Sequence, residues 1–248
     1  MTTRIDAHFV AAGKYHDIDF ARLEVLKLLA EHPEIRTSVA ANYGDVDRIA
    51  ACQFLVTYTC DLLPSETETV AIRKFVENGG RWLALHGTNS VLRFTEAGLV
   101  DTPEERPDVM DILGTQFKAH PPIGAPLTVK ILEKDHALTR GFEDFEVIDE
   151  LYLSKTVAPI QILMQTSFTG EATGFVDLNW DAGAVPILYL RQLGKGAVLY
   201  NTLGHCRGHY DLPEMMPFYE HPERCAWNYP VYYEMLRRGI SWSKGQIN

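Results

Sequence analysis

Residues 81–87 read RWLALHG, an apolar run that ends in a histidine followed by a glycine. Its composition is typical of a buried strand, and the Gly79-Gly80 pair before it is typical of a helix end. The preceding helix has an equally clear beginning, because Ser65 and Glu68 have the spacing of a capping box. A helix followed by a buried strand is the repeating unit of a parallel sheet, so this stretch predicts an α/β fold.

The N-terminal part of the chain shows the same alternation. Residues 4–12, 35–40 and 52–59 have the composition of strands, and residues 19–32 carry apolar side chains at three- and four-residue spacing, as a helix does. This order predicts a parallel sheet with helices on both faces. Ligands bind such sheets at the carboxyl ends of the strands, which is where the opening stretch places His86.

The second half of the chain continues with strand-like segments and a closing helix at 228–241. The expected strands are 127–132, 145–153, 160–166, 186–193 and 197–203. Residues 95–125, rich in proline, glycine and acidic residues, are expected to be an insertion that forms the rim of a pocket. We find no repeat or linker, so we expect one domain over residues 1–248.

Composition excludes several classes of partner. The formal net charge of −10 disfavours nucleic acids and anionic membranes, and no apolar run is long enough to span a bilayer. The N-terminus has no signal-peptide pattern, which predicts a cytoplasmic protein. The four cysteines form no CxxC pair and are expected to be free thiols.

Histidines form the most informative constellation. His16, His86 and His205 each follow an expected strand and His120 ends the insertion, so these loops could share one face of the sheet. The candidate carboxylate is Glu150. Imidazoles of this kind are ligands for zinc or manganese. They are also suited to general acid–base work near neutral pH, and the residues alone leave both chemistries open.

The carboxylate assignment rests on strand alternation. Asp149 and Glu150 are adjacent, so in a strand only one of them would point into a site. Tyr152, two residues past Glu150, would face the same side and offer its hydroxyl to a substrate. The competing interpretation is a solvated acidic edge. His209 and His221 lie in the polar loop 206–227, and the sequence does not assign them a role in the site.

Several familiar active-site motifs are absent. The sequence contains neither GxGxxG nor GxxxxGK[ST], which predicts no nucleotide cofactor. It also lacks HExxH and the GxSxG nucleophile elbow. His86 occupies the position of an elbow nucleophile, where it cannot replace a serine or cysteine in acyl transfer.

Five segments carry a resemblance to a known family. They are His16 after a glycine, GGRWLALHG, ILGTQFKAHPP, DHALTRGFEDFEVIDELY and GKGAVLYNTLGH. Together they resemble the trehalose-utilisation (ThuA-like) family of the class I glutamine amidotransferase-like superfamily, although Ala137 stands where the family usually has proline. The resemblance implies a flavodoxin-like parallel sheet, mixed at the edge, with helices on both faces. It also implies no glutaminase activity, because His86 replaces the elbow cysteine.

The resemblance further implies carbohydrate catabolism through 3-keto-glycosides that a partner sugar dehydrogenase would make. The first hypothesis is therefore an enzyme with hydrolase- or lyase-type action on a glycoside or keto-sugar. Its catalytic residues would be His86, His120, Glu150 and Tyr152, and the residues holding a divalent metal would be His16, His86, His120 and His205. The alternative is a non-catalytic carbohydrate-binding or regulatory module. A third hypothesis is a hydrolase that uses Cys206 as its nucleophile. The sequence does not determine whether the protein forms a homo-oligomer.

Overall fold

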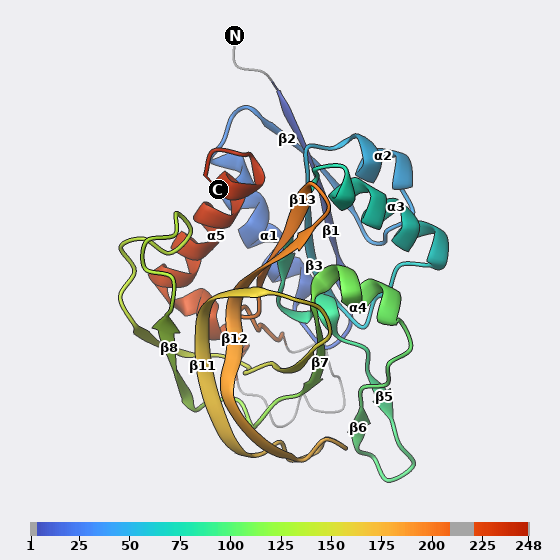
Figure 1. The fold of residues 1–248 in the computed structure, drawn as a ribbon. Helices are drawn as coiled ribbons and strands as arrows, with labels where there is room; N and C mark the ends of the chain where they lie inside the picture. Colours follow the sequence, from blue (N-terminus) through green and yellow to red (C-terminus); the bar gives the residue numbers. More distant parts are fainter. Residues whose placement is uncertain (1–3, 209–220, 248) are drawn as a thin grey trace.

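A computed structural model describes residues 4–208 and 221–247 of the chain. The strands of its main sheet are β1 (Ile5–Gly13), β2 (Ile35–Ala40), β3 (Phe54–Cys60), β4 (Arg81–Leu85), β8 (Pro126–Ile131), β9 (Phe145–Ile148), β11 (Gln161–Glu171), β12 (Asn179–Leu193) and β13 (Gly196–Asn201). They pair in the order β2-β1-β3-β4-β13-β12-β11-β8-β9 (Figure 1). Two small sheets accompany it, β5 (Arg93–Phe94) with β6 (Val100–Asp101) and β7 (Thr115–Ala119) with β10 (Leu153–Thr156).

The main sheet confirms the predicted α/β class. Its first five strands, from β2 to β13, are parallel, whereas β12, β11, β8 and β9 continue it in antiparallel fashion. The sheet is therefore parallel at one side and mixed at the edge, as expected. Among the described residues, no helix is both long enough and apolar enough to cross a membrane.

Helices cover both faces of the parallel half. They are α1 (Ile18–Ala30), α2 (Val46–Ala51), α3 (Glu66–Glu77), α4 (Pro107–Leu113) and α5 (Pro230–Ser243). α1 and α5 lie on one face and α2, α3 and α4 on the other (Figure 1). Alternation within β4 explains this, because Leu83 and Leu85 enter the first apolar cluster and Trp82 and Ala84 the second.

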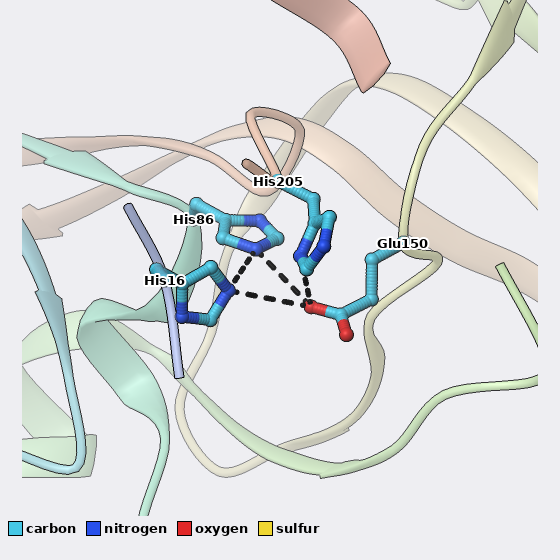
Figure 2. Close-up of side chains that lie close together, drawn as sticks. All are labelled: His16, His86, Glu150 and His205. Carbon is cyan, nitrogen blue, oxygen red and sulfur yellow. Dashed lines mark hydrogen bonds and ion pairs between the residues drawn. The ribbon is translucent and has the colours of Figure 1, made fainter. Parts of the chain in front are cut away.

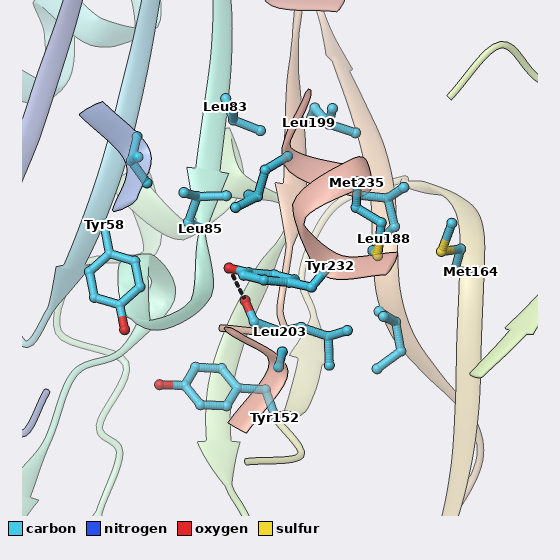
Figure 3. Close-up of a cluster of buried hydrophobic side chains, with 14 of the residues drawn as sticks. Tyr58, Leu83, Leu85, Tyr152, Met164, Leu188, Leu199, Leu203, Tyr232 and Met235 are labelled. Atoms are coloured by element: carbon cyan, nitrogen blue, oxygen red, sulfur yellow. Dashed lines mark hydrogen bonds between the residues drawn. The ribbon is translucent and has the colours of Figure 1, made fainter. Parts of the chain in front are cut away.

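The face under α5 contains the larger apolar cluster. Tyr232 and Met235 of α5 pack against Leu83 and Leu199 from neighbouring strands (Figure 3). The same cluster reaches Tyr152, which lies beyond the carboxyl ends of the strands. The core is thus continuous with the edge of the sheet where the sequence places its histidines.

One predicted strand is wrong in its middle. Residues 145–153 do not form a single strand, because β9 ends at Ile148 and β10 begins at Leu153. The chain leaves the main sheet between them, and β10 pairs instead with β7. The Asp149 carboxylate accepts the backbone amides of Gly204 and His205, so this segment is held by the loop after β13.

Residues 95–125 have two structural roles. The β5–β6 hairpin projects from the body of the molecule (Figure 1). By contrast, α4 places Val109, Met110, Ile112 and Leu113 in the apolar cluster beneath α2 and α3. The segment therefore contributes to the core as well as to the surface near the strand ends.

The capping box before α3 forms as the sequence predicts. The Ser65 hydroxyl accepts from the backbone amide of Glu68, and the Glu68 carboxylate accepts from the amide of Ser65. We expect Ser65→Ala to lower the free energy of unfolding by about 1 kcal/mol, because an amide at the helix start loses its acceptor. Urea unfolding would measure this against Thr67→Ala, an exposed substitution in the same turn. Equal stability of the two variants would contradict the cap's contribution.

Candidate metal centre

Three strand ends and one loop bring four side chains together. His16 follows β1, His86 follows β4, His205 follows β13, and Glu150 comes from the loop between β9 and β10 (Figure 2). One ligand atom from each lies within 4.8 Å of all the others, and all four residues are buried. The carboxyl edge of the parallel strands is where such convergence is expected.

His86 stands in a tight elbow. Its φ is 45°, in the left-handed region that side chains rarely occupy, and it opens a short 3-10 turn over residues 86–89. The next residue must be glycine, because a Cβ on Gly87 would lie 2.6 Å from the carbonyl oxygen of Thr59. At this elbow the His86 side chain leaves the end of β4 and points toward His16, Glu150 and His205 (Figure 2).

Backbone carbonyls orient two of the imidazoles. Nδ1 of His16 lies 3.2 Å from the carbonyl oxygen of Lys14, and Nδ1 of His86 lies 2.8 Å from that of Thr202. A carbonyl only accepts, so each Nδ1 carries the hydrogen and each Nε2 presents a lone pair. The two Nε2 atoms are 2.9 Å apart, and as neutral rings their lone pairs would face each other unless a cation or a proton lies between them.

A carboxylate orients the third imidazole. Nε2 of His205 donates to Oε2 of Glu223 across 2.9 Å, which directs Nδ1 toward Oε2 of Glu150, 3.2 Å away. The same Glu150 oxygen lies 3.2 Å from Nε2 of His86 and 3.5 Å from Nε2 of His16. A carboxylate behind a ligating histidine is the usual outer support of a metal site.

These distances fit a bound divalent cation. Ligand atoms at the edges of a zinc tetrahedron, with bonds near 2.0–2.1 Å, are about 3.3 Å apart. Four of the six distances here, 2.9 Å between His16 and His86 and 3.2–3.5 Å to Glu150, bracket that value, and all six are within 4.8 Å. Three imidazole nitrogens and one carboxylate oxygen suit zinc, manganese and related ions. The group formed by His16, His86, Glu150 and His205, which we call the His₃Glu group, could therefore hold a metal.

Burial and charge divide the imidazoles into two types. Burial lowers the pKa of His16, and it lowers the pKa of His86 to about 4, so both rings are neutral near pH 7. Burial also acts against a charge on His205, but Glu150 and Glu223 outweigh it and raise the pKa of that ring to about 9. Burial opposes a charge on Glu150 as well, yet the imidazoles of His120 and His205 hold its pKa well below the usual range.

His120 lies on the other side of the same carboxylate. Its Nε2 is 3.0 Å from Oε1 of Glu150, whereas the His₃Glu group uses Oε2. Its Nδ1 donates to the carbonyl oxygen of Pro121 at 2.8 Å. The compact group of possible ligands does not include His120, which was expected from the sequence as both a metal ligand and a catalytic residue. It borders a pocket beside that group instead.

Tyr152 lies against the site through its ring. The ring centroids of Tyr152 and His86 are 4.4 Å apart, and the Tyr152 hydroxyl accepts from the Ser90 hydroxyl at 3.4 Å. It lines the same pocket as His120. The contact of this hydroxyl with a substrate, expected from the sequence, stays a prediction.

Two acidic residues have roles that sequence reasoning missed. Asp149 is 2% and Glu150 4% exposed, so the interpretation as a solvated acidic edge is wrong. Burial raises the pKa of Asp149 to about 7, and its carboxylate still binds the loop that carries His205. Glu223 had no detectable signal, because it lies far along the chain in a segment without regular structure.

The remaining candidates are less prominent. Cys206 is fully buried with its Sγ 3.1 Å from the Tyr58 hydroxyl, and it does not line the pocket beside His120. All four cysteines are free, as expected. His221 is exposed, and His209 lies outside the described residues.

The fold and the site define an α/β protein of flavodoxin-like class with a buried histidine–carboxylate group at the strand ends. Its membership is more specific. The model of the family described as "Trehalose utilisation" (ThuA) matches residues 10–221, and the chain belongs to this family. No curated relative matches the sequence.

Solved structures share the fold at low sequence identity. A ThuA-like protein from Bacteroides uniformis has a TM-score of 0.67 at 15% identity, covering 100% of this chain and 94% of its own. One from Parabacteroides merdae has a TM-score of 0.63 at 14% identity, covering 99% and 92%. A β-galactosidase from Rahnella sp. R3 has a TM-score of 0.58 at 12% identity, covering 100% of this chain but 32% of its own.

Metal content provides the direct test of the His₃Glu group. We expect untagged protein incubated with zinc or manganese to retain close to one ion per chain by elemental analysis, and His86→Ala to lose it, because a ligand nitrogen disappears. His120→Ala should keep the ion, since its ring contacts the opposite carboxylate oxygen. His136→Ala, a histidine outside the group, is the matched control. Wild-type protein that retains neither ion would contradict the assignment.

The raised pKa of His205 predicts proton release on metal binding. Below a pKa of about 9 the metal-free ring carries two protons, and ligation through Nδ1 requires the loss of one. We expect about one proton released per ion near pH 7, measured by calorimetry in buffers of different ionisation enthalpy. Glu223→Gln should reduce the release, because Glu223 is one cause of the raised pKa. An unchanged release in that variant would contradict this account of His205.

Proposed function

We propose that this protein is a carbohydrate-catabolism enzyme that acts on a 3-keto-glycoside or a related sugar, without glutaminase activity. Membership in the trehalose-utilisation family supports the carbohydrate class. The observation that carries the proposal is the His₃Glu group, in which two carbonyls and Glu223 orient the three imidazoles toward the Glu150 carboxylate. A binding site for a neutral sugar has no need of such a group.

A divalent ion is the cofactor of the proposal, held by His16, His86, His205 and Glu150. When bound, such an ion polarises a carbonyl or lowers the pKa of water. The chain's own contribution is orientation. The Lys14 and Thr202 carbonyls and Glu223 fix the rings, so little reorganisation is needed when a charge develops nearby.

His120 is the proposed proton carrier. It lines the pocket, and Glu150 lies 3.0 Å from its Nε2, so the carboxylate positions the ring beside the His₃Glu group. A 3-keto group acidifies the neighbouring C2–H bond, and His120 takes that proton while the electron pair moves into a C2–C3 enolate. Re-formation of the ketone breaks the C1–O bond and forms a C1–C2 double bond. The departing oxygen receives a proton from His120, which restores the neutral ring.

The keto group in this scheme must come from a separate oxidation. The chain has no nucleotide-binding fingerprint, so a partner sugar dehydrogenase is part of the proposal. The small-molecule substrate is a carbohydrate, and the reaction is of lyase or hydrolase type, depending on whether water adds to the product.

Substitution of His120 separates an enzyme from a binding module. We expect His120→Ala to lower kcat on 3-keto-glucosides by about 10²–10⁴-fold with metal content unchanged, because a positioned proton donor and acceptor is lost. The measurement is turnover of the metal-loaded protein, with ligand affinity determined in parallel. The conservative control is His120→Gln, which keeps bulk and hydrogen bonding. A variant with altered affinity but wild-type turnover, or a wild type without turnover, would favour the non-catalytic module.

A further inference from the structure

The pocket beside the His₃Glu group has two chemically different ends. It encloses about 390 Å³, and its charged or ionisable side chains at the polar end are His16, His120, Glu150 and Arg207. Its other walls are mainly apolar. The aromatic side chains among them are Tyr15, Phe94, Phe117, Tyr152 and Phe175.

From this division we infer that the substrate is a glycoside whose aglycone is aromatic or otherwise flat and apolar, rather than a second sugar. The inference rests on the proposed function for the sugar end. The aglycone would lie between the aromatic walls, and the sugar ring would face the His₃Glu group and His120.

The aromatic walls are organised as a receptor for a flat group. Phe117 lies 4.3 Å from Tyr152 and 5.8 Å from Phe175 between ring centroids, and Phe175 packs edge-on against His120 at 4.8 Å. Offset and edge-to-face contacts of this kind are the favourable arrangements for aromatic rings. An aryl group inserted here would extend an existing cluster.

A second sugar ring would find few partners at this end. Among the described lining residues, Leu92, Val100, Phe117 and Phe175 offer no side-chain hydrogen-bonding group. The Tyr152 hydroxyl accepts from Ser90, so it can offer a ligand one O–H donor at most. Hydroxyls buried against such walls would lose water without replacement, which is costly.

The mouth of the pocket is also lined by apolar side chains. Phe94, on β5, is 62% exposed although it lines the pocket, and it meets Tyr15 edge-on with centroids 6.3 Å apart. Val176 and Leu99, near the same hairpin, are also exposed. A ligand that covers Phe94 would remove this apolar surface from water.

Binding of unreactive glucosides tests the inference without requiring turnover. The metal-loaded protein would be titrated calorimetrically with phenyl and methyl glucosides of both anomers. We expect the preferred phenyl anomer to bind about tenfold or more tightly than its methyl counterpart, since an aryl ring stacked in an apolar pocket contributes at least that factor. Trehalose should bind more weakly than the phenyl glucoside.

The Phe94→Ala variant tests whether the preference for phenyl over methyl glucosides comes from this pocket. Because Phe94 is mostly exposed, its removal should leave the fold and the metal content unchanged, abolish most of the phenyl preference and leave methyl glucoside affinity unaltered. Val70→Ala, an exposed apolar substitution on α3, should change neither affinity. A preference retained in full by Phe94→Ala would overturn the assignment.

The outcomes distinguish the inference from the proposed function. Equal affinity for phenyl and methyl glucosides, tighter binding of trehalose, or no measurable binding of any glucoside would each overturn the aglycone assignment. A clear phenyl preference in a protein that turns over no 3-keto-glucoside would uphold the inference and defeat the proposed chemistry. Turnover of 3-keto-glucosides without a phenyl preference would uphold the proposed chemistry and overturn the aglycone assignment.

Discussion

One buried carboxylate is the interaction on which the site depends. Glu150 is almost fully removed from water, yet its two oxygens contact four imidazoles, three at Oε2 and His120 at Oε1. A carboxylate in such surroundings costs several kcal/mol unless positive charge compensates for it. In the metal-free protein, His120 and His205 supply part of that charge, and a divalent ion would supply it more completely. The architecture around Glu150 could therefore hold a cation.

The parallel sheet makes this convergence possible. Strands β1, β4 and β13 end at the same edge, so three residues far apart in the chain reach one point without long loops. The elbow at His86 adds a strained backbone, with φ of 45°, which the packed strand end and Gly87 maintain. In amidotransferase relatives, the resemblance places a nucleophile at this elbow. In this chain the elbow carries an imidazole that points to the other members of the His₃Glu group.

Sequence reasoning succeeded where local rules determine the outcome. The Ser65 cap, the strand at 81–85 and the histidines at strand ends follow from short-range patterns and from the common edge of parallel strands. It failed where contacts distant in sequence decide the backbone. The chain breaks at 149–152 because Asp149 binds amides some 55 residues away, and Glu223 reaches His205 from an irregular segment. No periodicity records either contact, and the separate β7–β10 pairing was equally invisible.

Burial serves the polar and the apolar ends of the pocket in opposite ways. At the polar end, a low dielectric keeps His16 and His86 neutral near pH 7, so their lone pairs are available without competition from protons. At the other end, the aromatic walls exclude water and offer a hydrophobic ligand a favourable surface. The two effects reinforce each other, because an apolar group seated against Phe117 and Phe175 would further dry the space above Glu150. Drying would strengthen each electrostatic contact of the His₃Glu group, so a ligand that displaces this solvent would also affect a bound ion.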